Sequence, residues 1–333
     1  MPRWFSVTDP EFAEHVCRSL GDLDGYAGIW QVTRAFTREH PKDERIVLRC
    51  ENSETGQSVA VKANKTRKQN RQQALALTEL GTVTPDCLTV RHMPEDHSFF
   101  VMDWIGAPLL NRPLRGEEPR RKKAITMAGA WLSKMQSASV ARGVPASSKP
   151  FGIRPPHVYH GPAAGIARRL RRRLRAMGPL NGSVVMLHGD FHPGNLFFRD
   201  KRLLAFDRLF NKHGGAHFDA AWFLCHLALQ RENSQEKGRP WPGDHDTDRR
   251  YFFDGYGAIK SQELASFDVV EDVALTKIWK ARLAAKSTQA DGLVEAFGLL
   301  EPETSRHRPG RLVATDNGDA AWMAGPSSHG KEP

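Results

Sequence analysis

The sequence predicts an α+β fold in two lobes, the first small and built on an antiparallel sheet, the second larger and mainly helical. Apolar residues alternate with a period of two in three stretches of residues 29–62, which predicts a three-stranded antiparallel meander. Residues 124–140 instead show the amphipathic spacing of a helix, and residues 269–297 are also expected to be helical. Three prolines in residues 107–119 mark a boundary between the two kinds of pattern.

These patterns divide the chain of 333 residues into five segments. Residues 1–28 are a helical preamble, and residues 29–106 form the small lobe. A linker at 107–119 leads to the large lobe at 120–300. Residues 301–333 are rich in Pro, Gly, Ser and charge and hold only scattered apolar side chains, which predicts a disordered tail.

Short periodic runs predict the elements of the preamble and the small lobe. In the preamble, Phe12, Val16 and Leu20 fall on one face of a helix that opens at a proline. The expected elements are a helix at 10–20, strands at 30–36, 45–50 and 57–61, a helix at 67–80, and strands at 87–91 and 98–102.

The large lobe is expected to hold helices and two short hairpins. Residues 147–162 are rich in Pro, Gly and His and are expected to be irregular. An arginine-rich run follows in which Ile166, Leu170 and Leu174 repeat every four residues, which favours an amphipathic helix with a solvated basic face over an anion-binding patch. The other expected elements are a helix at 124–140, strands at 184–187, 196–198 and 203–206, a helix headed by Asp219, and helices at 251–256 and 269–297.

Composition indicates a soluble globular protein of the cytoplasm. No apolar run approaches the roughly 20 residues of a membrane span, and the first residues lack the apolar core of a signal peptide. Four scattered cysteines without a C-x-x-C pair suit reduced thiols. The net charge of +10 comes without an aromatic signature of RNA binding, so we expect no nucleic-acid partner.

A polar loop between two short apolar runs carries the chemistry. It reads H-G-D-F-H-P-G-N over residues 188–195, and its glycines and proline oppose a helix. Phosphoryl transfer requires a carboxylate beside the attacking hydroxyl, an amide oxygen that can hold a metal ion, and a further carboxylate that joins the metal to the phosphates. Asp190, Asn195 and Asp207 meet this requirement in order, and we expect their oxygen atoms to converge on one divalent cation.

The sequence His188-Gly189-Asp190-x-x-x-x-Asn195 resembles the catalytic loop of the aminoglycoside phosphotransferase and choline kinase family, which has a protein-kinase-like fold. The resemblance covers roughly residues 29–297. It implies ATP and Mg²⁺ as cofactors and a small-molecule hydroxyl as the acceptor of the γ-phosphate. It also implies that Asp190 is the catalytic base and that Asn195 and Asp207 are metal ligands.

The resemblance extends to the small lobe. Lys62 closes a Val-Ala-Val-Lys strand, as does the family's lysine that holds the nucleotide phosphates, although a strand-end lysine often simply reaches solvent. Met102, Asp103 and Trp104 would form the hinge whose backbone binds adenine, and an ordinary interior strand is the alternative.

Three features depart from the family pattern. The helix that should pair a glutamate with Lys62 offers Gln72 and Gln73, and its acid, Glu79, lies near its far end. The turn at 37–44 contains no glycine to cover the phosphates. Arg208 follows Asp207 and could pair with it or reach a phosphate.

Two other functions stay open. The departures would suit a kinase-like pseudoenzyme that binds nucleotide without turnover. A metal-dependent hydrolase is suggested by His188 and His192, four residues apart like zinc ligands on a helix, but Gly189 and Pro193 oppose that helix. We expect His213 and His217 to be loop residues, and Asp219 to cap a helix and brace the catalytic loop.

The sequence leaves the acceptor open among sugars, amino sugars and amino alcohols. An aminoglycoside is polycationic and would require an acidic cleft. The positive net charge of the chain therefore favours a neutral or anionic acceptor.

Overall fold

The computed structural model describes residues 10–38, 44–141, 162–176, 184–199, 201–238, 241–259, 261–284, 311–314 and 320–323. The chain forms two compact units. The first contains Met1–Ala107 and Leu204–Asn211, and the second contains Pro108–Leu203 and Lys212–Pro333. Residues 204–211 thus belong to the first unit, where the sequence pattern assigned them to the large lobe. Residues 108–119 belong to the second unit.

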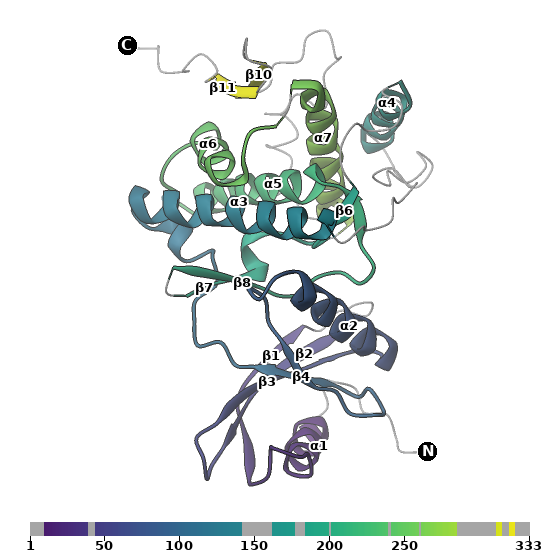
Figure 1. Ribbon diagram of the computed structural model, residues 1–333, viewed down its shortest axis with the longest axis vertical. Helices are drawn as coiled ribbons and strands as arrows, with labels where there is room; N and C mark the ends of the chain where they lie inside the picture. Colours follow the sequence, from purple (N-terminus) through teal and green to yellow (C-terminus); the bar gives the residue numbers. More distant parts are fainter. Residues whose placement is uncertain are drawn as a thin grey trace. The chain divides into compact units, whose positions relative to one another are not determined.

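An antiparallel sheet of five strands forms the first unit, in the order β1-β2-β3-β5-β4. The predicted three-stranded meander is confirmed, since β1 pairs with β2 and β2 pairs with β3. β4 begins later than expected, and Cys87 instead forms an isolated bridge with Ala205. The strands are β1 (Trp30–Arg38), β2 (Arg45–Asn52), β3 (Ser58–Asn64), β4 (Val90–His92) and β5 (Phe100–Asp103) (Figure 1).

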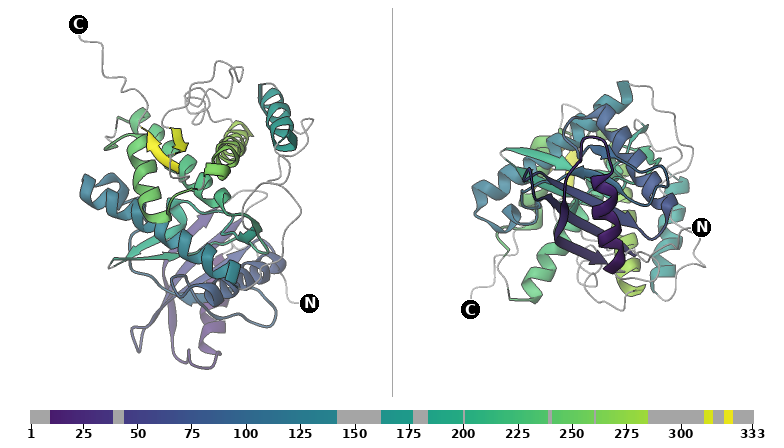
Figure 2. Two further views of the ribbon diagram at one scale, coloured as in Figure 1. Left: turned by 45° about the horizontal axis from the view of Figure 1, so that its top comes forward. Right: turned by 90° about the horizontal axis from the view of Figure 1, so that it is seen from below.

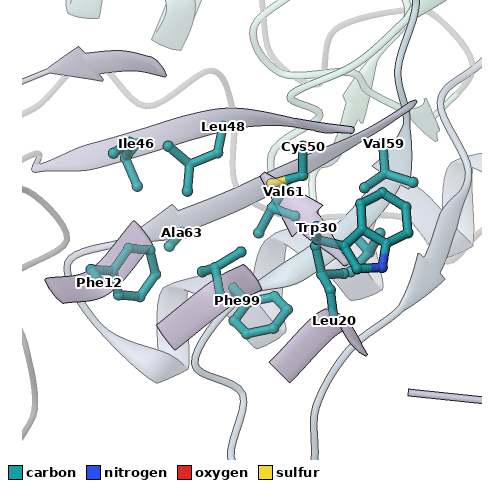
Figure 3. Packing of buried hydrophobic residues seen from close by; sticks show 12 residues of the cluster. Phe12, Leu20, Trp30, Ile46, Leu48, Cys50, Val59, Val61, Ala63 and Phe99 are labelled. Carbon is teal, nitrogen blue, oxygen red and sulfur yellow. The ribbon is translucent and has the colours of Figure 1, made fainter. Parts of the chain in front are cut away.

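Helix α1 (Pro10–Gly21) covers one face of this sheet, as Figure 2 shows. The predicted apolar face of the helix is confirmed, because Phe12, Val16 and Leu20 are all buried. They join side chains from β2, β3 and the start of β5 in one core, which Figure 3 shows from close by. The residues that the sequence separated as a preamble are therefore an integral part of the first unit.

Strand β3 is buried on both faces, and this decides where Lys62 points. Val59, Val61 and Ala63 belong to the core shared with α1. Successive side chains of a strand point to opposite faces, so Lys62 lies on the other face of the sheet. Its side chain is nevertheless buried, with a residue exposure of 2%. A buried ammonium group needs an anionic partner, which makes Lys62 a candidate for a functional site rather than a surface lysine.

Helix α2 (Arg67–Val83) is fixed to the sheet by polar side chains at its first turns. Thr66 and Gln69 form a capping box at its N-terminus. The buried Asn70 accepts hydrogen bonds from the backbone N–H of Asn64 at 2.6 Å and donates to the carbonyl of Ser98 at 2.7 Å. Because these bonds join the helix to β3 and to the segment before β5, α2 has a fixed position beside the face that carries Lys62.

The second unit is mainly helical, as predicted. Strand β6, which pairs with β9, precedes the polar loop at residues 188–195, and β7 and β8 pair after it. Its helices are α3 (Glu118–Ala141), α4 (Pro162–Ala176), α5 (His217–Glu236), α6 (His245–Tyr256) and α7 (Ser261–Ala284). Its strands are β6 (Val184–Met186), β7 (Leu196–Arg199), β8 (Arg202–Ala205), which runs on into the first unit, β9 (His213–Gly215), β10 (Arg311–Ala314) and β11 (Ala320–Met323), with short 3₁₀ turns at Pro113–Arg115 and Pro193–Asn195.

Several other expectations can be compared with the structure. Ile166 and Leu170 on α4 are buried, which confirms the amphipathic helix. The four cysteines are free thiols. β10 and β11 pair within the segment 301–333, where we expected no regular structure. The irregular excursion predicted at 147–162 and most of the turn at 37–44 lie outside the described residues. No helix in the described ranges is both long and apolar enough to cross a membrane.

Helices α3 and α6 cross at a close approach that requires glycine on both. A Cβ atom added at Gly255 would lie 1.9 Å from the carbonyl oxygen of Thr126, and one added at Gly129 would lie 2.1 Å from that of Phe252. Backbone cannot move aside as a flexible side chain can. These glycines therefore set how closely the two helices pack.

We expect Gly255→Ala to lower the free energy of unfolding by about 2 kcal/mol or more, because the new methyl group forces α3 and α6 apart. Chemical denaturation followed by circular dichroism measures this. Gly165→Ala on α4 is the matched control, since a Cβ there meets only an arginine side-chain atom at 3.8 Å. An unchanged midpoint for Gly255→Ala would contradict the close packing.

Candidate active site

The loop after β6 is held by a buried carboxylate from α5. Asp219 accepts hydrogen bonds from the backbone N–H of His188 at 2.6 Å and of Gly189 at 2.9 Å, one on each carboxylate oxygen. Gly189 has a φ of 81°, a conformation in which glycine is favoured. The predicted bracing role of Asp219 is confirmed. The residue lies within the first turn of α5, however, and not ahead of the helix as a cap.

Asp219→Asn is expected to destabilise the protein by about 1–3 kcal/mol, because an amide places an NH₂ group against one of the two backbone donors. Asp219 is fully buried, so water cannot compensate. Thermal unfolding of the variant beside wild type measures the loss. Equal stability would show that the two bonds contribute little to holding the loop.

Hydrogen bonds fix the carboxylate of Asp190 from both sides. Asn195 Nδ2 donates to Asp190 Oδ2 at 3.0 Å and to the Asp190 carbonyl at 2.9 Å. Trp222 Nε1 on α5 donates to Asp190 Oδ1 at 3.1 Å. The structure therefore brings the predicted pair Asp190 and Asn195 together. It adds Trp222, which the sequence did not single out as a site residue.

Histidines determine the charge state of Asp190. Burial by itself would raise the pKa of Asp190, but its close contact with His192 and the charges of His192, His188 and His226 outweigh burial and hold the pKa well below its usual range. The ring of His192 is oriented by its Nδ1, which accepts from the Gly194 N–H at 3.0 Å. Its Nε2 lies 3.6 Å from Asp190 Oδ2. Asp190 is therefore ionised at neutral pH and suited to orient a hydroxyl group.

Asn195 has one oxygen atom suited to a metal ion. Both hydrogen bonds of its side chain use Nδ2, which fixes the amide so that Oδ1 faces away from Asp190. Amide and carboxylate oxygens are the ligands that Mg²⁺ and Ca²⁺ prefer. The residue type and its orientation therefore fit a hard divalent cation.

In the first unit, Lys62 and Asp207 form an ion pair. Lys62 Nζ pairs with Asp207 Oδ1, which also accepts from Gln73 Nε2 at 3.2 Å. Arg45 on β2 lies 3.6 Å from Asp207 Oδ2. Asp207 itself has a φ of 59°, a conformation that Asp and Asn tolerate better than most residues. The sequence predicted Lys62 and Asp207, whereas Arg45 was missed because its place depends on how β2 pairs with β3.

The acid of α2 has a different partner. Arg208 Nη1 donates to Glu79 Oε2 at 2.6 Å and to the carbonyl of Ala76 at 3.3 Å. Arg208 is almost fully buried, with an exposure of 1%. Of the three candidates on α2, Gln73 is the residue that bonds Asp207, the partner of Lys62. Glu79 ties the residue after Asp207 to α2.

The predicted hinge residues lie at the end of β5 and just beyond it. Met102 is buried and pairs with Ala60 of β3. Asp103 accepts two hydrogen bonds from Arg91, at 2.8 Å and 2.7 Å. The ring of Trp104 stacks on Phe36, with ring centroids 6.4 Å apart.

His188 and His192, whose spacing suggested a zinc site, do not lie on a helix. His188 is buried, with its ring against Trp131 and Phe191, and the segment to His192 is a loop. His213 lies in β9 and His217 begins α5, so both belong to regular elements and not to loops as we expected. Among the described residues, no three His, Cys, Asp or Glu side chains gather as a metal site. The helix that a zinc site at His188 and His192 would require is therefore not formed in this loop.

An oriented carboxylate with an amide beside it in one unit, and a buried lysine paired with a carboxylate in the other, are the groups that phosphoryl transfer uses. The model of the phosphotransferase enzyme family matches residues 33–263, and the chain belongs to this family. It is therefore a phosphotransferase of the class that acts on hydroxyl acceptors. No curated protein matches the sequence.

Solved structures show that the fold is protein-kinase-like. Amicoumacin kinase hAmiN, in complex with AMP-PNP, Ca²⁺ and Ami, aligns with a TM-score of 0.59 at 11% identity over 89% of this chain and 95% of that chain. Plasmodium vivax ethanolamine kinase aligns with a TM-score of 0.55 at 8% identity over 87% and 89%. A choline/ethanolamine kinase family protein from Mesorhizobium loti gives 0.52 at 13% identity over 87% and 95%.

Proposed function

We propose that the protein is an ATP-dependent small-molecule kinase that transfers the γ-phosphate to a hydroxyl of a sugar, amino sugar or amino alcohol. The observation that carries the proposal is the carboxylate of Asp190, which Asn195 and Trp222 orient through separate oxygen atoms. A carboxylate held in this way can accept a hydrogen bond from the acceptor and aim its oxygen at the phosphorus atom. Asp190 takes the hydroxyl proton as the new P–O bond forms and the bond to ADP breaks.

The nucleotide would be held mainly by residues of the first unit. Lys62 is buried and already bonded to one anionic oxygen, so it can bind phosphate oxygens with little cost in side-chain entropy. The backbone groups of residues 102–104 would bind the adenine ring. Arg45 is a second cation on this unit, and we assign it to the phosphates as well.

Asn195 and Asp207 would hold the divalent cation, and we assign Mg²⁺. Both side chains present oxygen donors, which this hard cation prefers over nitrogen or sulfur. Bound there, the ion neutralises the charge of the phosphates. Without it, Asp207 accepts from Lys62 and Gln73, so its carboxylate is already oriented.

The test is a screen of sugars, amino sugars, amino alcohols and aminoglycosides for acceptor-dependent ADP release, with mass spectrometry of the product. The expected result is one acceptor class whose product gains the mass of a phosphoryl group. ADP release that no acceptor stimulates would contradict the proposal.

The departures from the family pattern favour one alternative, a pseudoenzyme. Gln73 stands near Lys62 where the family offers a glutamate, and Arg208 follows Asp207. A pseudoenzyme would release heat on titration with Mg-ATP and yield no phosphorylated product with any acceptor. Calorimetry and the product assay together separate the two functions.

A further inference from the structure

An aromatic surface on α5, formed by the half-buried Trp222 beside the buried Phe218, adjoins Asp190. The ring of Trp222 stacks on that of Phe218, with centroids 5.8 Å apart and an interplanar angle of 22°. The Trp222 ring also lies against the ring of His226, with centroids 4.9 Å apart. The three residues are spaced by four along the helix and so share one face. Trp222 is half-buried and donates its Nε1 hydrogen to Asp190. The surface therefore begins at the proposed reacting carboxylate.

A lysine from α7 stands at the other end of this surface. Lys277 Nζ lies 4.6 Å from the centre of the Phe218 ring. Burial lowers the pKa of Lys277 to about 8, and the nearby charge of Lys212 adds to the effect. In the described part of the chain, Lys277 pairs with no carboxylate. A positive charge that is partly removed from water beside a second positive charge gains most from a bound anion.

Among the described residues between Asp190 and Lys277, no carboxylate neutralises this charge. The face of the Phe218 ring stabilises the ammonium group through a cation–π contact but carries no net charge. The carboxylate of Asp219, which follows Phe218 in sequence, is fully buried and accepts from the backbone of the catalytic loop. Surroundings of this kind disfavour a polycationic acceptor, because repulsion from Lys277 adds to the loss of water around each ammonium group.

We propose that the acceptor is an anionic hydroxy compound, whose hydroxyl reacts at Asp190, whose C–H face lies on Trp222 and whose carboxylate or phosphate binds Lys277. This inference rests on the proposed function and specifies its substrate class. The reaction moves the terminal phosphoryl group of ATP to the acceptor oxygen, releases ADP and passes the hydroxyl proton to Asp190. Two stacked rings separate the ends of the site, which favours an acceptor of sugar length over a three-carbon hydroxy acid.

Matched acceptors test the charge requirement. ADP release is compared for glucuronate and glucose, for gluconate and sorbitol, and for glucose 6-phosphate and glucose, with glycerate as the short acid. We expect kcat/KM to be at least about tenfold higher for the anionic member of one pair, which corresponds to about 1.4 kcal/mol. The carboxylate and phosphate pairs distinguish the two sources of the anion.

Variants of Lys277 test the residue. Lys277→Met should raise KM for the anionic acceptor about 10- to 100-fold, leaving KM for ATP unchanged, and Lys277→Arg should retain most of the affinity. Lys280→Met, one turn further along α7, is the matched control. A loss of kcat without a change in KM, or an equal effect of both methionine variants, would indicate a structural role and overturn the assignment.

A labelling experiment gives a readout that does not depend on turnover. Trinitrobenzenesulfonate is applied at pH 8, and peptide mass spectrometry follows modification of Lys277. The anionic members should protect Lys277 and the neutral members should not. If no pair differs in turnover, calorimetric binding or protection, the proposal is overturned. If the protein phosphorylates only neutral acceptors, the anionic substrate class is wrong but the proposed kinase function holds. If no acceptor in the wider screen is phosphorylated, the proposed function itself is contradicted.

Discussion

Replacing Asp190 by asparagine is expected to lower kcat on the order of 10³-fold or more while binding of Mg-ATP persists. The amide keeps the size of the side chain but cannot accept the hydroxyl proton. It also replaces one carboxylate oxygen, which accepts from Asn195 or Trp222, by an NH₂ group that can only donate. Because this loss falls on the transition state, kcat and kcat/KM should fall together. Steady-state ADP release measures the loss of turnover, and calorimetry with Mg-ATP measures nucleotide binding.

The control for this variant is Asp254→Asn, which changes the same residue type at an exposed position of α6. Its kcat should equal that of wild type. Turnover of Asp190→Asn within a few-fold of wild type would remove Asp190 from its role as the base. Loss of both turnover and nucleotide binding would point instead to damage of the fold, which circular dichroism can detect.

Asp207→Asn is expected to lower kcat by a similar factor, on the order of 10³ or more, and to raise the Mg²⁺ concentration needed for half-maximal rate. The substitution removes the charge that holds a divalent cation. It also removes the Asp207 carboxylate from beside the buried ammonium group of Lys62. The variant should therefore lose stability as well, by about 3 kcal/mol, because removing one partner of a buried ion pair is costly.

A double-mutant cycle separates these two effects. Lys62→Met removes the buried charge, so Lys62→Met/Asp207→Asn should be more stable than Asp207→Asn alone, although it stays inactive. If the stability loss of the double variant equals the sum of the losses of the two single variants, the Lys62–Asp207 pair does not form in solution. An unchanged Mg²⁺ requirement in Asp207→Asn would exclude Asp207 as a metal ligand.

The parts of the site that the sequence predicted are those fixed by short-range geometry. Asp190 and Asn195 lie five residues apart in a tight loop, so their spacing alone brings them together. Lys62 was predicted from its place at the end of a Val-Ala-Val-Lys strand, which resembles the family's phosphate-binding lysine. Such residues depend little on the rest of the fold.

The missed residues depend on distant packing. Trp222 reaches Asp190 only because α5 runs beside the catalytic loop, and Lys277 reaches the same helix from α7. Arg45 reaches Asp207 through strand pairing. Within the chain, a lysine or arginine of this kind looks like any surface cation, so no local signal could have identified it. The aromatic run around Trp222 was visible, but its contact with Asp190 was not.

The first unit is assembled from two stretches of chain, and this has a consequence for biosynthesis. Leu204–Asn211 bring Ala205, which bridges to Cys87, and Asp207, which pairs with Lys62. A nascent chain that ends before residue 204 therefore lacks the carboxylate that pairs with Lys62 on the central strand of the sheet. The small unit is therefore completed only after residues 204–211 have been synthesised, and a fragment cut after Ala107 should be a client for chaperones and not a free-standing nucleotide-binding module.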